Sequence, residues 1–351
     1  MKNLHFLLHD HGADAALITF LPDIRWACGF TGSNAVLVVL PDAVHFLSDG
    51  RYTEQARQEV QGAAVHTPGY ALFEYMVEEN LLGDARRIVY QADHVTVAQL
   101  EQWRGLLPSV QWTPGTALLT RQVASKTDDE VARMRRSQRV TDDVFEHMLG
   151  VIRPGMREQE VAAEIVYQHL RRGAATMSFE PIVASGARGA LPHARPTDKR
   201  LEFGDMVVLD FGCFVDGYAS DMTRTIALGE PGEEARNVYE IVLDAQKKAI
   251  AQAHAGISTK DLDAAARSVI DAAGYGEFFT HSLGHGIGLQ THEWPRVSHQ
   301  TDDVLPEGTA ITIEPGVYLP GKFGVRIEDI VVLCADGCDD LTASPKALIV
   351  L

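Results

Sequence analysis

The apolar positions of the first 120 residues alternate between helical and extended spacing. A helix is expected in MKNLHFLLHDHG and should end at Gly12, because glycine readily adopts the left-handed conformation that closes a helix. The short apolar runs AALITF, AVLVVL and AVHFLSD have the length and composition of strands, and GRYTEQARQEV again has helical spacing. The pattern predicts an α/β domain over residues 1–122.

A second region begins with a long helical pattern over residues 127–150. Thr127 can cap this helix, and Glu130, three residues later, completes a capping box. Three more segments have helical spacing, whereas residues 176–226 and the chain from 279 onward have the pattern of strands, turns and loops. The helical segments are REQEVAAEIVYQHLRR, EEARNVYEIVLDAQKKAIAQAHAG and STKDLDAAARSVIDAAG. We therefore expect a second domain over residues 123–351.

A short repeat occurs within this second region. GDMVVLD (204–210) and GTAITIE (308–314) each place a glycine six residues before an acid that ends an apolar strand. A further acid follows each copy, Asp221 in the first and Glu328 in the second. The repeat predicts two duplicated halves related by a pseudo-twofold axis, and a chance alignment of short apolar strands is the alternative.

The first copy has the sequence of a β-hairpin. Asp216-Gly217 suits a two-residue turn, which would place Asp210 opposite Thr223. Asp210 and Asp221 then project from the same face as diagonal neighbours, roughly 7–8 Å apart by backbone. Two unpaired carboxylates at that distance repel each other, and a bound cation would remove the conflict.

The second copy has the same character. Glu314 stands directly before Pro315, at the end of an apolar strand, where proline stops ladder pairing. In GVRIEDIVVL, alternation places Arg326 and Glu328 on one face of a strand and Asp329 on the other. Each copy therefore contributes two acids whose side chains can face one site.

Composition and charge narrow the function classes. The chain has 351 residues, 46% of them hydrophobic, and a net charge of −17, which repels nucleic acid and anionic membranes. Four cysteines are too few for a disulfide framework, and CADGC, with Cys334 and Cys338, suits a turn better than a metal knuckle. His9, Asp10 and Asp14 interrupt the N-terminal apolar run, so we expect no signal peptide or membrane span and a cytoplasmic protein.

The glycine-rich segment GHGIGLQTHEWPR adds His285 as a candidate nitrogen ligand. Four carboxylates and one histidine, from four strands and a loop, are too many ligands for one tetrahedral zinc ion, but they suit two ions with bridging carboxylates. Oxygen-rich ligation favours Mn²⁺, although the same ligands accept Co²⁺, Fe²⁺ or Zn²⁺. The candidate metal ligands are Asp210, Asp221, His285, Glu314 and Glu328.

At these residues the chain resembles the pita-bread metallopeptidases, a family that includes methionine aminopeptidases, aminopeptidase P and prolidase. The family's ligand order of Asp, Asp, His, Glu, Glu is matched by the five candidates, and LPHA, HSLGHGIGL, HE, EPGVY and GVRIED match its other motifs. GFTGSNAVLVV and SDGRYTEQA resemble the additional domain of the proline-specific members. The resemblance implies an α/β (α+β) fold, with an N-terminal creatinase-like domain and a C-terminal pita-bread domain of two duplicated halves.

The resemblance implies hydrolysis of the Xaa–Pro bond at the N-terminus of a peptide, with two divalent metal ions. Glu314 would accept a proton from the attacking water, His292 would donate to the developing oxyanion, and His193 would lie near the scissile nitrogen. His281 would line the proline pocket, although each of these histidines could instead be structural. Arg326 would orient a ligand carboxylate, and both Tyr318 and Arg326 are expected among the substrate-binding residues.

Two proline-specific activities remain open. Prolidase cleaves dipeptides and must bind a free carboxylate just beyond the proline, for which arginine is the natural partner, whereas aminopeptidase P takes longer chains. Arg296 in HEWPRVS and Arg51 in DGRY are the candidates, and the first motif resembles compact prolidases of bacteria and archaea. We expect a prolidase that acts as a homodimer, with aminopeptidase P as the alternative and a non-catalytic peptide-binding module as a remote one.

Overall fold

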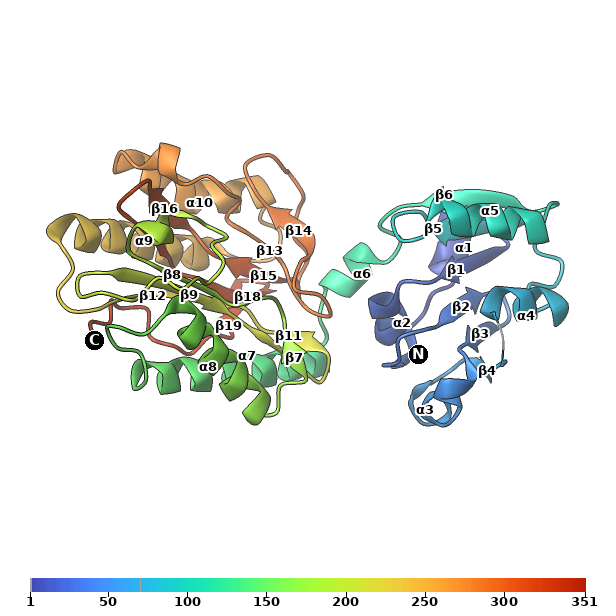
Figure 1. Cartoon of the computed structure of the whole chain (residues 1–351). Coiled ribbons are helices and arrows are strands. Elements are labelled where there is room, and N and C mark those ends of the chain that lie inside the picture. The colour runs from blue at the N-terminus through green and yellow to red at the C-terminus, as the bar shows by residue number, and fades with distance from the viewer. Residues whose placement is uncertain (1, 70) are drawn as a thin grey trace. The chain divides into compact units, whose positions relative to one another are not determined.

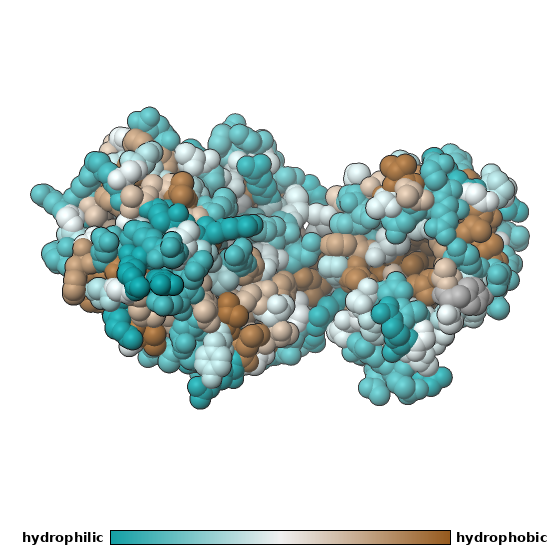
Figure 2. Space-filling model, viewed as in Figure 1, coloured by the Kyte–Doolittle hydropathy of each residue, from teal (hydrophilic) through white to brown (hydrophobic). Residues whose placement is uncertain are grey.

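The computed structural model describes residues 2–69 and 71–351, and its internal contacts divide the chain into two compact units, Met1–Val123 and Ala124–Leu351 (Figure 1). Polar residues cover most of the face shown in Figure 2, with apolar residues scattered among them. The large apolar side chains with the highest exposure are those of Val97 and Phe203. Among the described residues, no helix combines the length and apolar composition needed to cross a bilayer.

The N-terminal unit is a mixed six-stranded sheet in the order β4-β3-β2-β1-β5-β6, with helices on both faces. Alternate residues of β1 enter different cores, because successive side chains of a strand point to opposite faces. Ala16 and Ile18 pack in one cluster, and Ala15 and Leu17 in the other. The elements are α1 (Phe6–His11), β1 (Ala15–Ile18), α2 (Leu21–Cys28), β2 (Val36–Val39), β3 (Val44–Leu47), η1 (Gly50–Tyr52), α3 (Thr53–Glu59), β4 (Ala64–His66), α4 (Leu72–Glu78), β5 (Arg87–Gln91), α5 (Val97–Leu106), β6 (Gln111–Gly115) and α6 (Thr120–Ala124).

The expected elements of this unit are confirmed. The first helix ends at Gly12, which has a left-handed φ of 54°, and the three predicted strands are β1, β2 and β3. GRYTEQARQEV forms a short 3₁₀ turn followed by α3. The α/β character expected from apolar spacing is therefore present.

The C-terminal unit repeats one arrangement twice. In the first half, α7 and α8 precede the sheet β8-β9-β12, and in the second half α9 and α10 precede the sheet β14-β13-β15-β18-β19. Each helix pair packs against its own strands in a separate apolar core. The elements are α7 (Asp128–Leu149), α8 (Glu158–Arg171), β7 (Thr176–Met177), β8 (Ile182–Ser185), η2 (Gly186–Ala190), β9 (Met206–Phe211), β10 (Cys213–Val215), β11 (Tyr218–Ala219), β12 (Met222–Ala227), α9 (Glu233–Gln252), α10 (Thr259–Ala272), η3 (Gly276–Phe278), β13 (Gly284–Gly286), β14 (Glu293–Val297), β15 (Ala310–Ile313), β16 (Gly316–Leu319), β17 (Phe323–Arg326), β18 (Asp329–Cys334) and β19 (Gly337–Asp340).

The register of the first acid hairpin is confirmed. Asp210 lies opposite Thr223 on β9 and β12. The chain turns at Asp216 and Gly217, whose φ angles of 51° and 78° are both positive, as the tight hairpin turn requires. In the second half, the strand expected through GVRIEDIVVL is interrupted, because β17 ends at Arg326 and β18 begins at Asp329.

The capping box at the start of α7 is also confirmed. The Thr127 hydroxyl accepts a hydrogen bond from the amide of Glu130, and the Glu130 carboxylate accepts one from the amide of Thr127 at 2.8 Å. Glu130 also accepts a hydrogen bond from the Tyr218 hydroxyl, so the cap ties α7 to β11. The first turn of α7 is thereby fixed against the small sheet β11-β10-β7.

Replacing Thr127 by alanine should lower the free energy of unfolding of the C-terminal unit by about 1 kcal/mol, because the cap is lost. Urea denaturation followed by circular dichroism measures the change. Thr127→Ser is the matched control, since serine caps as well, and it should stay within about 0.5 kcal/mol of the wild type. Equal stability of the alanine variant and the wild type would contradict the capping role.

Candidate metal centre

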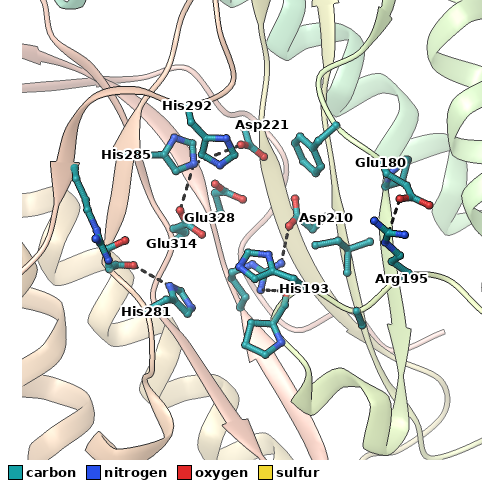
Figure 3. A pocket seen from close by; sticks show the side chains of 18 of the residues that line it. Glu180, His193, Arg195, Asp210, Asp221, His281, His285, His292, Glu314 and Glu328 are labelled. Atoms are coloured by element: carbon teal, nitrogen blue, oxygen red, sulfur yellow. Dashed lines mark hydrogen bonds and ion pairs between the residues drawn. The ribbon is translucent and has the colours of Figure 1, made fainter. Parts of the chain in front are cut away.

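A cavity of about 660 Å³ opens in the C-terminal unit and is lined by residues from both halves (Figure 3). Its lining includes the acids at the ends of the central strands, together with four histidines and two arginines that were singled out from the sequence. It also has apolar lining, including Phe179 and Ile182. The repeat therefore brings together side chains that lie more than 100 positions apart in the chain.

The five candidate ligands lie in this cavity. Asp210 belongs to β9, Asp221 directly precedes β12, and His285 belongs to β13, where the sequence had suggested a loop. Glu314 follows β15, and Glu328 precedes β18. Ligand atoms of Asp221, His285 and Glu328 all lie within 4.8 Å of one another, and the His285 Nε2 is 3.5 Å from a Glu314 oxygen. Figure 3 shows the carboxylates of Asp210, Asp221, Glu314 and Glu328 gathered around one space.

Burial makes this group of carboxylates hard to ionise without a cation. Desolvation raises the pKa of Glu314 to about 8, and it raises the pKa of Asp221 and of Glu328, each with a further contribution from the neighbouring carboxylates. The Oδ1 atom of Asp210 is buried and has no hydrogen-bond partner among the described residues. Burial and mutual repulsion of this kind are relieved when a divalent cation is bound, so the donor set fits a metal centre.

The environment of His285 leaves one ring nitrogen available as a ligand. Its Nδ1 lies 3.0 Å from the carbonyl oxygen of Gly286, so this nitrogen carries the proton and donates it. The unprotonated Nε2 then faces the acids, 3.8 Å from Asp221. Burial lowers the pKa of His285, which keeps the ring neutral as metal ligation requires.

Arg326 links the acids to the wall of the cavity. Its guanidinium is buried and donates to Asp210 Oδ2 at 2.6 Å, to the Tyr318 hydroxyl at 2.7 Å and to Thr223 Oγ1 at 2.9 Å. Thr223 in turn donates to Glu328 at 2.7 Å. One arginine therefore orients carboxylates from both halves.

His281 is hydrogen-bonded at both ring nitrogens. Its Nδ1 donates to the carbonyl of Ser282 at 2.8 Å, and its Nε2 accepts the proton of the Tyr318 hydroxyl at 2.9 Å. Burial lowers the pKa of His281 to about 3, so the ring is neutral. Its nitrogens are thus occupied, and it lines the cavity as an uncharged ring. Tyr318 itself lies behind the lining residues.

His193, His292 and Arg296 lie at the exposed edge of the cavity. The ring centroid of His292 is 4.3 Å from that of His285. Arg296 lies opposite His285 in the β13–β14 pair, and its guanidinium has no hydrogen-bond or ion-pair partner within residues 2–69 and 71–351. Arg51 belongs to the N-terminal unit, where it donates two hydrogen bonds to Asp49, at 2.8 and 2.9 Å.

Some cavity residues had not been identified from the sequence. Phe179 and Ile182 form part of the apolar lining, and Glu293 receives a hydrogen bond from Lys126 at 2.7 Å in a buried ion pair. Glu293 is the acid of the HE motif, but no local sequence signal indicates its partner Lys126, because the two residues lie 167 positions apart. Apolar lining residues likewise have no signal that distinguishes them from core.

A duplicated α/β unit that presents four carboxylates, three of them buried, and a neutral histidine to one cavity has the features of a metal-dependent hydrolase. The chain belongs to metallopeptidase family M24, whose model matches residues 132–334, and residues 1–122 match the creatinase/prolidase N-terminal domain. The family resemblance, the fold class and the metallopeptidase activity expected from the sequence are confirmed. The peptide-binding module without catalysis is not supported.

The individual proteins that resemble this chain include Xaa-Pro dipeptidases and an X-Pro aminopeptidase. The chain is 46% identical to the Xaa-Pro dipeptidase of Pyrococcus furiosus over 224 residues, which are 64% of each chain. The Xaa-Pro dipeptidase structure from Bacillus anthracis has a TM-score of 0.96 at 37% identity and covers 99% of this chain and 98% of that one. The X-Pro aminopeptidase structure from Thermotoga maritima has a TM-score of 0.93 at 36% identity, over 99% of this chain and 100% of that one.

A divalent cation should stabilise this protein through the acid cluster. With Mn²⁺ at 100 times its dissociation constant, metal-free protein should gain about 2.7 kcal/mol, seen as a higher melting temperature. Asp221→Asn and His285→Ala should lose most of that gain. Glu180→Gln is the control, because Glu180 is an exposed acid in the cavity lining that pairs with Arg195. An undiminished Mn²⁺ response in Asp221→Asn would contradict this ligand assignment.

Proposed function

We propose that this chain is an Xaa-Pro dipeptidase that binds two divalent metal ions, with Mn²⁺ as the preferred ion. Asp210, Asp221, His285, Glu314 and Glu328 would hold the ions. When bound, they would act as Lewis acids and lower the pKa of the attacking water. Family membership supports a divalent metal, and the number of carboxylates, which exceeds the needs of one tetrahedral ion, supports two.

The remaining chemistry falls to three side chains. Glu314 takes the proton of the attacking water, because it is an acid of the cluster whose carboxylate faces the cavity. His292 donates to the developing oxyanion, and its position beside the His285 ring supports this role. His193, on the opposite wall, lies near the scissile nitrogen. Among residues 2–69 and 71–351, no side chain forms a hydrogen bond with either exposed histidine that substrate would have to break.

The proline ring of the substrate packs on His281. The His281 ring is neutral, half-buried and packed edge-on against Phe279, with centroids 5.1 Å apart. A flat, uncharged surface of this kind suits the apolar pyrrolidine ring. Tyr318, which is itself bound by Arg326, holds the His281 ring in place from behind. We therefore assign Tyr318 and Arg326 to the support of the substrate pocket.

The observation that carries the preference for dipeptides is the unpaired guanidinium of Arg296 at the edge of the cavity. A dipeptide ends in a carboxylate just beyond proline, and arginine binds carboxylates with paired hydrogen bonds. The ion pair with Asp49 leaves Arg51 less available to bind the substrate carboxylate. The likeness to the X-Pro aminopeptidase of Thermotoga maritima supports the alternative of longer substrates.

Two further features complete the proposal. We propose a cytoplasmic location, supported by cysteines that are free, with no disulfide among the described residues. A homodimer is proposed from the family resemblance alone. The substrate is a small peptide with proline at its second position.

His193→Ala and His292→Ala should each keep their bound metal and lose turnover of Ala-Pro by about 10²–10³-fold, as expected for the loss of a donor to the reacting atoms. Steady-state kinetics and metal analysis on the same samples measure both quantities. A variant that lost its metal instead would identify that histidine as a ligand.

Arg296→Ala should lower kcat/KM for Ala-Pro by about one to two powers of ten, because a charge-assisted hydrogen bond of about 1.5–3 kcal/mol is removed. Hydrolysis of Ala-Pro-Ala should fall less, since its carboxylate lies one residue further out. Arg51→Ala is the comparison variant. An unchanged ratio of the two efficiencies in both variants would favour the aminopeptidase.

A further inference from the structure

A carboxylate far from the metal ligands in sequence is buried beneath the cavity wall that carries His193. Glu158, the first residue of α8, is 0% exposed. Five donors meet its two oxygens, all at 2.8–3.0 Å. They are the amide and hydroxyl of Ser185, the amide and hydroxyl of Thr197, and Nε of Arg188. A buried carboxylate that accepts this many hydrogen bonds holds its donors in a fixed geometry.

The donors to Glu158 stand at both ends of one segment. Ser185 ends β8, Thr197 lies twelve positions later, and the chain between them forms η2 and the loop that carries His193. Arg188 ties the segment to itself, because its Nη2 donates to the carbonyl of Arg195 at 2.6 Å. Glu158 therefore holds the two ends of the segment together, and through Arg188 it also supports the chain between them.

The imidazole of His193 depends on this backbone for its position. It is exposed, and it has no hydrogen-bond partner within the part of the chain that the structure describes. Arg326 donates to the carbonyl of the preceding Pro192 at 3.1 Å. Gly189 packs so closely on Gly324 that a Cβ on Gly324 would lie 1.9 Å from the Gly189 carbonyl oxygen. The loop is thus held from the metal side by Arg326 and from the opposite side by Glu158.

The other two cavity histidines that are not proposed as metal ligands are positioned differently. His281 is hydrogen-bonded to Tyr318, and the ring of His292 lies beside that of His285. His193 has neither kind of support in the described structure. Its distance from the reacting atoms is consequently the one most sensitive to the conformation of its loop.

We propose that Glu158 is a positioning residue for the reaction and acts through His193. This inference rests on the proposed catalytic role of His193. Glu158 does not touch the cavity, and it sets where the imidazole stands by fixing both ends of residues 185–197. A displacement of about 1 Å at a reacting group can cost 10²-fold in rate, so an acid outside the cavity can control turnover.

Glu158→Gln tests the proposal at nearly constant volume. The substitution replaces one acceptor oxygen by an NH₂ donor. That donor must then face the backbone amides, hydroxyls or Arg188 side chain that donate to Glu158 in the wild type. We expect about 10²-fold lower kcat on Ala-Pro, with unchanged metal content. Hydrogen exchange should become faster in residues 186–197 and stay as in the wild type in the segment that carries His285. Glu160→Gln, an exposed acid two positions further along α8, is the control and should behave as the wild type.

A double-mutant cycle distinguishes positioning from general support of the fold. If Glu158 acts through His193, Glu158→Gln in a His193→Ala background should change kcat by less than about twofold. If the losses of kcat caused by the two substitutions multiply in the double variant, the proposal is overturned. Wild-type turnover by His193→Ala alone would instead remove the proposed role of His193, and this inference with it.

A milder variant keeps the test open if Glu158→Gln fails to fold. Arg188→Lys retains the positive charge but cannot bridge Glu158 and the Arg195 carbonyl together. It should lower kcat by about tenfold, and that loss should also vanish in the His193→Ala background. A loss of kcat that persists there would overturn the proposal.

Discussion

The rest of this structure depends on four carboxylates gathered in one cavity of the C-terminal unit. Like charges in a poorly solvated cavity repel strongly, and the described protein supplies one buried guanidinium, that of Arg326, directly to them. The fold therefore has to hold the acids in place against their own repulsion until cations bind. It does so with rigid strands: each acid lies at or next to the end of a strand whose apolar residues are fully buried, as in β9 and β15.

Further polar groups keep the cluster in position from behind. Arg224, 1% exposed at its side chain, donates to the main-chain oxygen of Glu328 and to Asp329. Its partner Asp329 also binds Lys346 and Gln246, so the network reaches the C-terminal segment and α9. A buried ion pair of this kind contributes little net stability over apolar packing, but losing one partner is costly. Its value here lies in fixing the backbone at Glu328, one of the proposed metal ligands.

The sequence was sufficient for the central acids and insufficient for the groups that support them. Asp210 and Thr223 could be placed in register because a two-residue turn and a period of two determine which residues face each other. Glu158, by contrast, looks like an ordinary solvated acid in the first turn of an amphipathic helix. Its burial depends on contacts with Ser185 and Thr197 that helix periodicity cannot reveal. The same holds for the pair of Lys126 and Glu293, which joins the start of α7 to the His292 loop.

The separation between a rigid centre and an exposed edge explains how one framework can serve related substrates. The proposed metal ligands are held by strands and buried networks, so they tolerate little change. Arg296 stands at the cavity edge without a partner among the described residues, and substitution there leaves the buried hydrogen bonds of the centre intact. Structures named for both activities, the Xaa-Pro dipeptidase of Bacillus anthracis and the X-Pro aminopeptidase of Thermotoga maritima, are each similar to this chain over nearly its whole length. If the substrate carboxylate binds at the cavity mouth, as proposed for Arg296, preference for substrate length depends on the charges there and not on the central acids.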